Sequence, residues 1–398
     1  MKYVFSGKLK IASIALFVLG LIGLVVSFII AKDALAEERV WANLLLNGFF
    51  FTGIAVAGTF FLAVNIVGES GWYTMLRRVP EALGQYTWVG MTAILILVLA
   101  GVFGQHNLWE FLNPEIVAND EILQGKMGYL NTPFYIARIV AYFLIWVGFA
   151  YLLRKFSLQD EQLGTFDHYI KVRKWAATFL ILFAVTSSTS AWDILMSIDA
   201  HWFSTLFGWY IFAGIFVSCL ASTMIIMLHL KRNGYMPNLN ESHIHDLGKF
   251  LFAFSIFWTY LYFSQFVLIW YANIPEEIVY FMERYDTAYR PLVLLMVAMN
   301  FALPLLILMT RDSKRNYNLL TGMALLILVG HWLDVYQIIM PGTVGTDRTL
   351  GDMFGLPEIS CLLMFAGLFI FVVFTALTKA NVEPTKATFL DESRHHQI

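Results

Sequence analysis

Ten long apolar runs, separated by polar segments, make up most of this chain. Each run has about 20 residues, the length that an α-helix needs to cross the hydrocarbon core of a bilayer. A membrane-spanning strand needs only about half that length, and a helix satisfies its own backbone hydrogen bonds in lipid. The pattern therefore predicts an all-α membrane protein with ten transmembrane helices, at residues 11–31, 43–66, 88–104, 133–152, 175–197, 204–230, 250–272, 291–310, 319–340 and 356–377.

The composition agrees with this class. Hydrophobic residues make up 59% of the 398 residues and charged residues 14%, which excludes a soluble globular chain. The formal net charge of -2 gives no sign of a nucleic-acid partner. Cys219 and Cys361 are the only cysteines, and both lie in apolar runs, so we expect neither a disulfide framework nor a thiolate metal site. The sequence lacks CxxCH, HExxH, GxSxG and phosphate-loop motifs, and we assign no catalytic residue and no covalently bound cofactor.

The distribution of basic residues predicts the orientation in the membrane. The segments on the side that carries both termini hold 19 of the 26 Lys and Arg residues, whereas the opposite loops hold six and Arg138 lies within the fourth span. Because cytoplasmic loops carry an excess of Lys and Arg, both termini are predicted to be cytoplasmic. Residues 1–380 then form a single polytopic membrane domain, and residues 381–398 form a polar C-terminal tail.

Two features of this topology bear on function. Spans two to five form one set of four and spans six to nine form another, and the two sets cross the membrane in the same orientation. This permits a parallel internal repeat. The loops 105–132 and 273–290 both fall on the outer side and are long enough to bind a partner or to cover helix ends. We treat them as candidate docking surfaces, with a role as lids as the alternative.

The stretch from Ser187 to Gly214 concentrates polar residues between two apolar runs. It contains Asp193, Asp199 and His201, and a carboxylate near the bilayer core costs several kcal/mol, of the order of 3, unless a neighbour satisfies it. Further polar residues lie in the predicted spans, and most fall in their outer halves, so the ionisable groups are predicted to converge near the outer leaflet. The full set of candidates for a proton route or a quinone site is Asp193, Asp199, His201, His331, Asp334, Arg138, Tyr260, Tyr262, Gln265 and Glu358.

Each candidate also has a structural interpretation. Arg138 can pair with Asp193 or Asp334 and hold the helices together, because intramembrane charges seek partners. His331 and Asp334 lie three residues apart and share a helix face, which suits either a ligand site or an internally satisfied pair. Carboxylates, a histidine and hydroxyls together are the groups from which proton relays are built.

The segment Trp192 to Gly208, WDILMSIDAHWFSTLFG, together with ten spans and cytoplasmic termini, resembles the polysulfide-reductase membrane-subunit family, also called NrfD-like. Within that family the chain is most similar to the shorter, ActF-type, of the two such subunits of bacterial alternative complex III. The longer sister subunit carries a similar motif. The likeness extends from about Lys8 to Leu377, and Ala200 stands where that branch often has a proline.

The resemblance implies a fold, a multi-subunit complex and a cellular membrane for this protein. Spans two to five and six to nine would form two four-helix bundles, flanked by the first and last spans. The protein would be a non-redox membrane subunit of a respiratory quinol:cytochrome c oxidoreductase in the bacterial inner (cytoplasmic) membrane. Haems and iron-sulfur clusters would belong to the partners, which are an iron-sulfur subunit, multihaem cytochrome c subunits and a sister NrfD-like subunit. Lipid and a terminal oxidase are further implied partners, and menaquinone or ubiquinone is the implied quinone.

Several functions fit these residues. The chain can be a scaffold with a proton route near the outer face, which we expect first, or a working quinol-binding subunit. Quinol oxidation releases protons, and Asp334 with His331, or Asp193 with His201, can accept them. A secondary transporter is an alternative of another class, because buried charges and a parallel repeat suit one. A third alternative is a purely structural anchor, in which the buried charges have no role beyond assembly.

Overall fold

The computed structural model describes residues 1–347 and 349–397. In these residues the protein is all-helical, and ten helices are long and apolar enough to cross a membrane, which confirms the predicted number of spans. The spans are α1 (Gly7–Ile30), α2 (Ala34–Val67), α3 with α4 (Arg78–Gly84 and Thr87–Val102), α7 (Thr132–Leu163), α8 (Phe166–Ile194), α9 (Phe207–Arg232), α10 (Glu241–Ala272), α12 with α13 (Arg290–Val297 and Leu303–Ile307), α14 (Tyr317–Val344) and α15 (Leu356–Leu377). Arg348, counted among the loop cations, and Ile398, the end of the predicted tail, lie outside the described residues.

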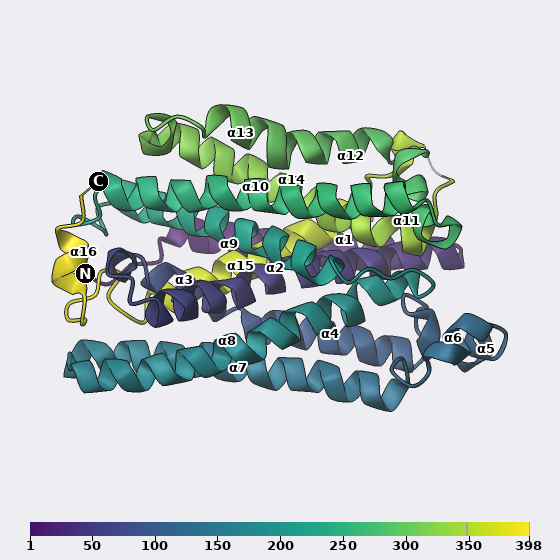
Figure 1. The fold of residues 1–398 in the computed structure, drawn as a ribbon, viewed down its shortest axis with the longest axis horizontal. Coiled ribbons are helices and arrows are strands. Elements are labelled where there is room, and N and C mark those ends of the chain that lie inside the picture. The colour runs from purple at the N-terminus through teal and green to yellow at the C-terminus, as the bar shows by residue number, and fades with distance from the viewer. Residues whose placement is uncertain (348, 398) are drawn as a thin grey trace.

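The spans run side by side along the long axis of the molecule (Figure 1). Both termini lie at one end, where Lys2 forms an isolated antiparallel bridge with Asn381 and the Met1 carbonyl accepts a hydrogen bond from Val382 N at 3.0 Å. We refer to this end as the terminal end and to the opposite one as the distal end. At the distal end the short helices α5 (Pro114–Ala118) and α6 (Glu121–Lys126) project from the body, and α11 (Pro275–Tyr285) lies nearby along the same end (Figure 1).

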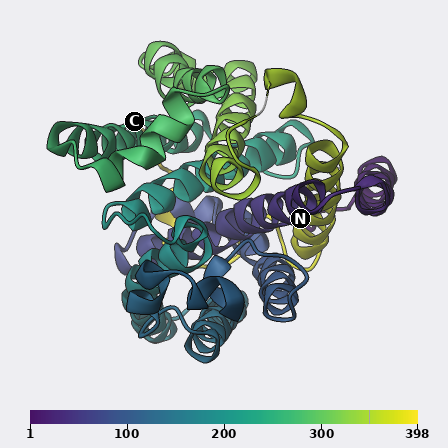
Figure 2. The same cartoon turned by 90° about the vertical axis from the view of Figure 1, so that its right-hand side faces the viewer.

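The helices differ strongly in burial. The most apolar windows of α2 and α9 are each 83% buried and that of α14 is 78% buried, whereas that of α1 is only 22% buried. Seen from the distal end, α1 (purple) lies at the edge of the bundle (Figure 2). The exposed side chains of α1 are Ile, Leu and Val, which is what a lipid-facing helix requires. The core therefore lies along α2, α9 and α14.

The contacts between helices divide the spans into two groups, one from each half of the chain. In the first half of the chain α2 packs against α4, α7 and α8, and in the second half α9 packs against α10 and α14, which packs against α12. The two halves meet where α2 contacts α9 and α14 and where α8 contacts α9. The last span, α15, packs against α2 and carries α1 on its other side.

Several helices extend beyond the predicted spans, because charged turns at their ends fold as helix. Asp33 caps α2, with its carboxylate accepting Ala36 N at 2.7 Å, so this helix begins before residue 43. The third span begins at Arg78 rather than 88, because α3 continues the span and its charged side chains, Arg78 and Glu81, are buried in the protein. Likewise α7 continues to Leu163, where Gly164 ends it in the left-handed conformation with φ 60°.

The predicted polar tail is folded. Residues 382–397 lie across the terminal end and include the short helix α16 (Leu390–Arg394), which packs against the 3-10 helix η1 (Trp72–Met75). Val382 and Leu390 are buried, and Ser393 is fully buried. The tail is therefore part of the folded structure.

Candidate functional site

A buried ion pair joins α7 to the end of α8 on the distal side. Arg138 binds Asp193 through two hydrogen bonds, from Nε at 2.7 Å and from Nη2 at 3.0 Å. The Asp193 side chain is fully buried and also accepts the Tyr142 hydroxyl at 2.6 Å. The guanidinium lies 3.8 Å from the centre of the Tyr129 ring and donates to the Tyr129 carbonyl. Both charges are thus compensated by a bidentate pair, which is the strong geometry for Arg and a carboxylate.

A second buried carboxylate, Asp334 on α14, has neutral partners. It accepts hydrogen bonds from the Tyr210 hydroxyl and, at 3.0 Å, from Trp258 Nε1. His331 Nδ1 lies 3.7 Å from the Asp334 carboxylate, and neither ring nitrogen of this buried histidine has a hydrogen-bond partner among the described residues. Asp334 therefore lacks the guanidinium partner that Asp193 has.

A small cavity lies on the distal side of Asp334. Its volume is about 10 Å³, close to what a single water requires. Gln265 and Tyr262, two of the predicted residues, line it together with Gln337, whose side-chain oxygen and nitrogen are buried without a partner among the described residues. Three polar side chains therefore surround a water-sized space next to the carboxylate.

Arg284 of α11 closes this cavity towards the distal surface. Its guanidinium donates to the carbonyls of Gln337 at 2.9 Å and Ile338 at 3.1 Å, and it stacks on the Tyr280 ring at 3.4 Å. Asp199 lies 3.5 Å from Arg284 Nη2, so the predicted Asp199 belongs to this cluster. Arg284 itself was missed, because the sequence places it in a loop whose folding back over α14 cannot be read from its residues.

The remaining predicted residues have different surroundings. Glu358 accepts Arg39 Nε at 2.7 Å and Nη2 at 2.8 Å and bonds Asn43, so it clamps α15 to α2. His201 lies on the distal surface, half exposed, with Nε2 2.6 Å from Asp120 of the α5–α6 segment. Tyr260 is 63% exposed and points out of the bundle, which separates it from the Asp334 cluster.

A larger cavity of about 300 Å³ lies at the distal end of the first half of the chain. Its walls are mostly apolar and aromatic, and the residues that line it include Lys126, Tyr129, Trp192, Met196, Trp202 and Phe203. The Lys126 amine donates to the Ala200 carbonyl, and burial lowers the pKa of this amine. The loop 105–132, which includes α5 and α6, therefore covers this cavity, and it is held there in part by the Asp120–His201 contact.

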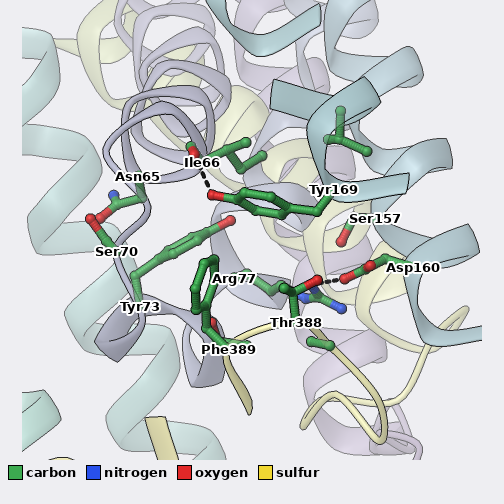
Figure 3. A pocket seen from close by; sticks show the side chains of 13 residues that line it. Asn65, Ile66, Ser70, Tyr73, Arg77, Ser157, Asp160, Tyr169, Thr388 and Phe389 are labelled. Carbon is green, nitrogen blue, oxygen red and sulfur yellow. Dashed lines mark hydrogen bonds and ion pairs between the residues drawn. The ribbon is translucent and has the colours of Figure 1, made fainter. Parts of the chain in front are cut away.

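The predicted convergence of ionisable groups concerns residues within the predicted spans, and further buried ionisable groups lie outside that set. A second network lies at the terminal end, where Arg77 pairs with Asp160 at 2.9 Å (Figure 3). In the same network Arg78 pairs with Glu81 at 2.5 Å. Its other members are Arg154, Ser157 and Glu161. The predicted spans leave Arg77 and Arg78 in the loop between residues 66 and 88, but α3 folds as helix here and both side chains are buried beside Asp160 and Glu161 of α7.

The eighth span is interrupted by a π-helix at Ala298–Ala302. Asn300, in this turn, is fully buried, and neither of its side-chain polar atoms has a partner among the described residues. Its amide packs against Gly330, where a Cβ atom would lie 2.2 Å from Asn300 Oδ1. Asn300 therefore contacts α14 at the residue before His331, and π-helical turns are common at functional sites.

Comparison with known proteins leaves the family of this chain open, because no protein-family model and no curated protein sequence matches it. Within residues 1–347 and 349–397, no three His, Cys, Asp or Glu side chains lie close enough to hold a metal ion. The function must therefore be argued from the polar centres themselves.

Proposed function

We propose that this protein is a membrane subunit of a bacterial respiratory quinol:cytochrome c oxidoreductase of the alternative complex III type. In this proposal it has no redox centre of its own and serves as a scaffold with a proton route near the outer face. The partners are an iron-sulfur subunit, multihaem cytochrome c subunits and a sister NrfD-like subunit in the inner membrane. Support comes from the ten-span fold, the likeness around Trp192–Gly208 and the buried carboxylates.

The arrangement of helices supports the same proposal. The packing of α2, α4, α7 and α8 on one side, and of α9, α10, α12 and α14 on the other, suits two four-helix bundles with α1 and α15 as flanking spans. The excess of Lys and Arg in the segments at the terminal end favours a cytoplasmic location for that end. The distal end would then face the extracytoplasmic side, where Asp193 and Asp334 lie.

The observation that carries the proposal is the contrast between these two carboxylates. Asp193 is held by a guanidinium and a hydroxyl, and the pair ties α7 to α8. Asp334 has neutral donors, an unsatisfied histidine one turn away and a water-sized cavity beside it. A proton relay needs a protonatable group and a polar path to water, and of these two carboxylates Asp334 is the one that lines the cavity.

The residues around Asp334 outline a route in the distal half of the protein. It leads from the Arg284–Asp199 cluster through the Gln337 cavity to Asp334 and His331, with Asn300 of the π-helix beyond. Protons released by quinol oxidation on a partner subunit, or moved during turnover, would pass along these groups. The Arg138–Asp193 pair takes no part in proton transfer in this scheme.

The test is the Asp334→Asn variant in the assembled complex, which keeps the hydrogen-bond acceptor for Trp258 and removes the titrating group. We expect quinol-driven cytochrome c reduction and the accompanying proton release to fall about tenfold or more, as for loss of a proton-transferring group. Gln265→Leu, which lines the same cavity but does not titrate, is the matched control and should cause a smaller loss. Unchanged turnover and proton release in Asp334→Asn, with the complex intact, would reject the proton route.

A second candidate function, quinol binding in this subunit, is favoured by the distal cavity of about 300 Å³. Its volume and its aromatic walls suit a planar, mostly apolar ring, and the Lys126 amine and the unpartnered Trp192 Nε1 suit oxygen atoms on that ring. Trp202→Ala should then raise the KM for quinol, while Phe263→Ala, an exposed aromatic on α10, should leave it unchanged. An unchanged KM in Trp202→Ala would exclude this cavity as the quinol site.

A further inference from the structure

The C-terminal segment 382–397 connects parts of the terminal end that are otherwise separate. Glu383 accepts the backbone and side-chain N–H groups of Asn238, in the loop between α9 and α10, at 2.9 and 2.8 Å. Ser393 donates to the Trp72 carbonyl at 2.9 Å and accepts Met75 N at 3.2 Å. His396 Nε2 lies 2.7 Å from Asp246 of α10. The segment therefore lies across both halves of the chain.

Under this segment lies a polar cavity that reaches the buried ion network (Figure 3). Ala387, Thr388 and Phe389 form its cover, and the Phe389 ring packs edge-on against Tyr169 at 5.1 Å. Figure 3 shows Tyr73, Arg77 and Asp160 beside Thr388 and Phe389, and all of them line the cavity. The cavity measures about 30 Å³, enough for one or two waters.

The polar atoms around the cavity require solvent. Arg77 Nε and Nη2, Asp160 Oδ1 and Thr388 Oγ1 are buried without hydrogen-bond partners among the described residues. A buried unsatisfied donor or acceptor costs about 1–3 kcal/mol, and more when the group is charged. Water enclosed in the cavity would satisfy these atoms and remove this cost.

The attachment of the segment suits reversible release. The segment is held mainly by part-buried hydrogen bonds of Glu383, Ser393 and His396. Its buried apolar side chains are few, mainly Val382 and Leu390, and Phe389 is only half-buried. Elements with few buried apolar contacts open at lower free energy than the core. The helices around the cavity, in contrast, are joined by the Arg77–Asp160 and Arg78–Glu161 pairs.

We propose that residues 382–397 form a removable plug, which closes the cavity at the Arg77–Asp160 pair and, on release, connects the buried ion network to the aqueous phase at the terminal end. The segment is thus a conformational device that controls water access. This inference does not depend on the proposed respiratory function, because it concerns the opposite end of the molecule from Asp334.

Cysteine accessibility tests the plug in the purified full-length chain, with any subunits that accompany it. Thr74 lines the cavity and is 4% exposed, and the native Cys219 and Cys361 are fully buried, so Thr74→Cys provides a single reporter. We expect a polar maleimide to label this thiol slowly in the intact chain and at least tenfold faster after removal of residues 383–398. Asp312→Cys, in an exposed loop at the same end, is the matched control and should react at the same rate in both backgrounds.

A second variant covers the case in which the truncated chain does not fold. Ser393 is fully buried against η1, so Ser393→Arg should release the segment while leaving its length unchanged. Faster labelling of Thr74→Cys in either background, with the melting temperature of the membrane body retained, supports the plug. Equal labelling rates with the segment docked, released and removed would overturn it.

Discussion

At the residue scale, the buried charges of this protein are tolerated because almost every one has a specific partner. Arg138 and Asp193 share two hydrogen bonds, and Glu358 is held by Arg39 in the same way. Such pairs do not make a fold more stable than an apolar core would, but removing one partner leaves a charge without compensation. Removing one partner should therefore cost much more stability in a buried ion pair than in an exposed one.

Arg138→Gln should therefore destabilise the protein by about 3–5 kcal/mol, because Asp193 stays buried without its counter-charge. Arg173 pairs with Glu69 at the surface, where the side chains are 39% and 47% exposed, so Arg173→Gln should cost less than about 1 kcal/mol. Unfolding of both variants in detergent, followed by intrinsic fluorescence, checks the difference. Similar small losses in the two variants would show that the Arg138–Asp193 pair is not a structural clamp.

His106, in the loop after α4, makes stability depend on pH. Its Nε2 lies 3.0 Å from the Leu97 carbonyl and its Nδ1 accepts Leu108 N at 3.3 Å, so the neutral ring fits this site and burial lowers its pKa. The folded state then binds a proton less tightly than the unfolded state, and stability falls as pH drops below the ordinary histidine pKa of 6.5.

The wild-type protein should thus melt at a lower temperature at pH 5.5 than at pH 7.5, with a contribution from His106 of up to about 1.4 kcal/mol per pH unit. His106→Gln can still donate to Leu97 and does not titrate, so its melting temperature should change less over the same interval. If the melting temperatures of the two proteins changed equally between pH 7.5 and pH 5.5, His106 would not be the source of the pH dependence.

At the element scale, the sequence predicts the spans well and their ends poorly. Runs such as residues 11–31 are recognisable because lipid requires about 20 apolar residues. The start of α3 is hidden, because Arg78 and Glu81 look like a polar loop until their partners on α7 are known. The same limit explains why Asp334 was found, within an apolar run, whereas Arg284 was missed, and why the π-helix at Asn300 left no signal in the sequence.

The contact between α1 and α15 depends on glycine at the crossing. A Cβ atom on Gly20 would lie 2.3 Å from Met364 N, and one on Gly367 would lie 2.5 Å from Phe17 N. Both clashes are with backbone, so no side-chain rotation relieves them. Since α1 has few other contacts, this crossing is what holds it to the bundle.

Gly20→Val should detach α1, with a cost of about 1–3 kcal/mol or more for overpacking, and should expose the link between α1 and α2 to protease. Gly148→Val on α7 is the matched control, because no atom lies within 4 Å of its Cβ position. Limited proteolysis of both variants in detergent measures the effect. Equal cleavage near Lys32 in the two variants would show that close packing at Gly20 is not required.

At the scale of the whole molecule, the two ends have different chemistry. The distal end carries the Asp334 centre, the aromatic cavity and the loop that covers it, whereas the terminal end carries the ion network under the C-terminal plug. Between them, α2, α9 and α14 form a tightly packed core. This asymmetry suits a subunit that works at one membrane face with partners and controls water access at the other.

The most direct test of the central claim is purification of the tagged chain from its native membranes, followed by identification of the subunits and by absorption and electron paramagnetic resonance spectra. We predict that the chain co-purifies with multihaem cytochrome c and iron-sulfur subunits, in a complex that reduces cytochrome c with quinol. Isolation of the chain alone, as a stable protein with no haem or iron-sulfur signal, would contradict the account and favour a transporter.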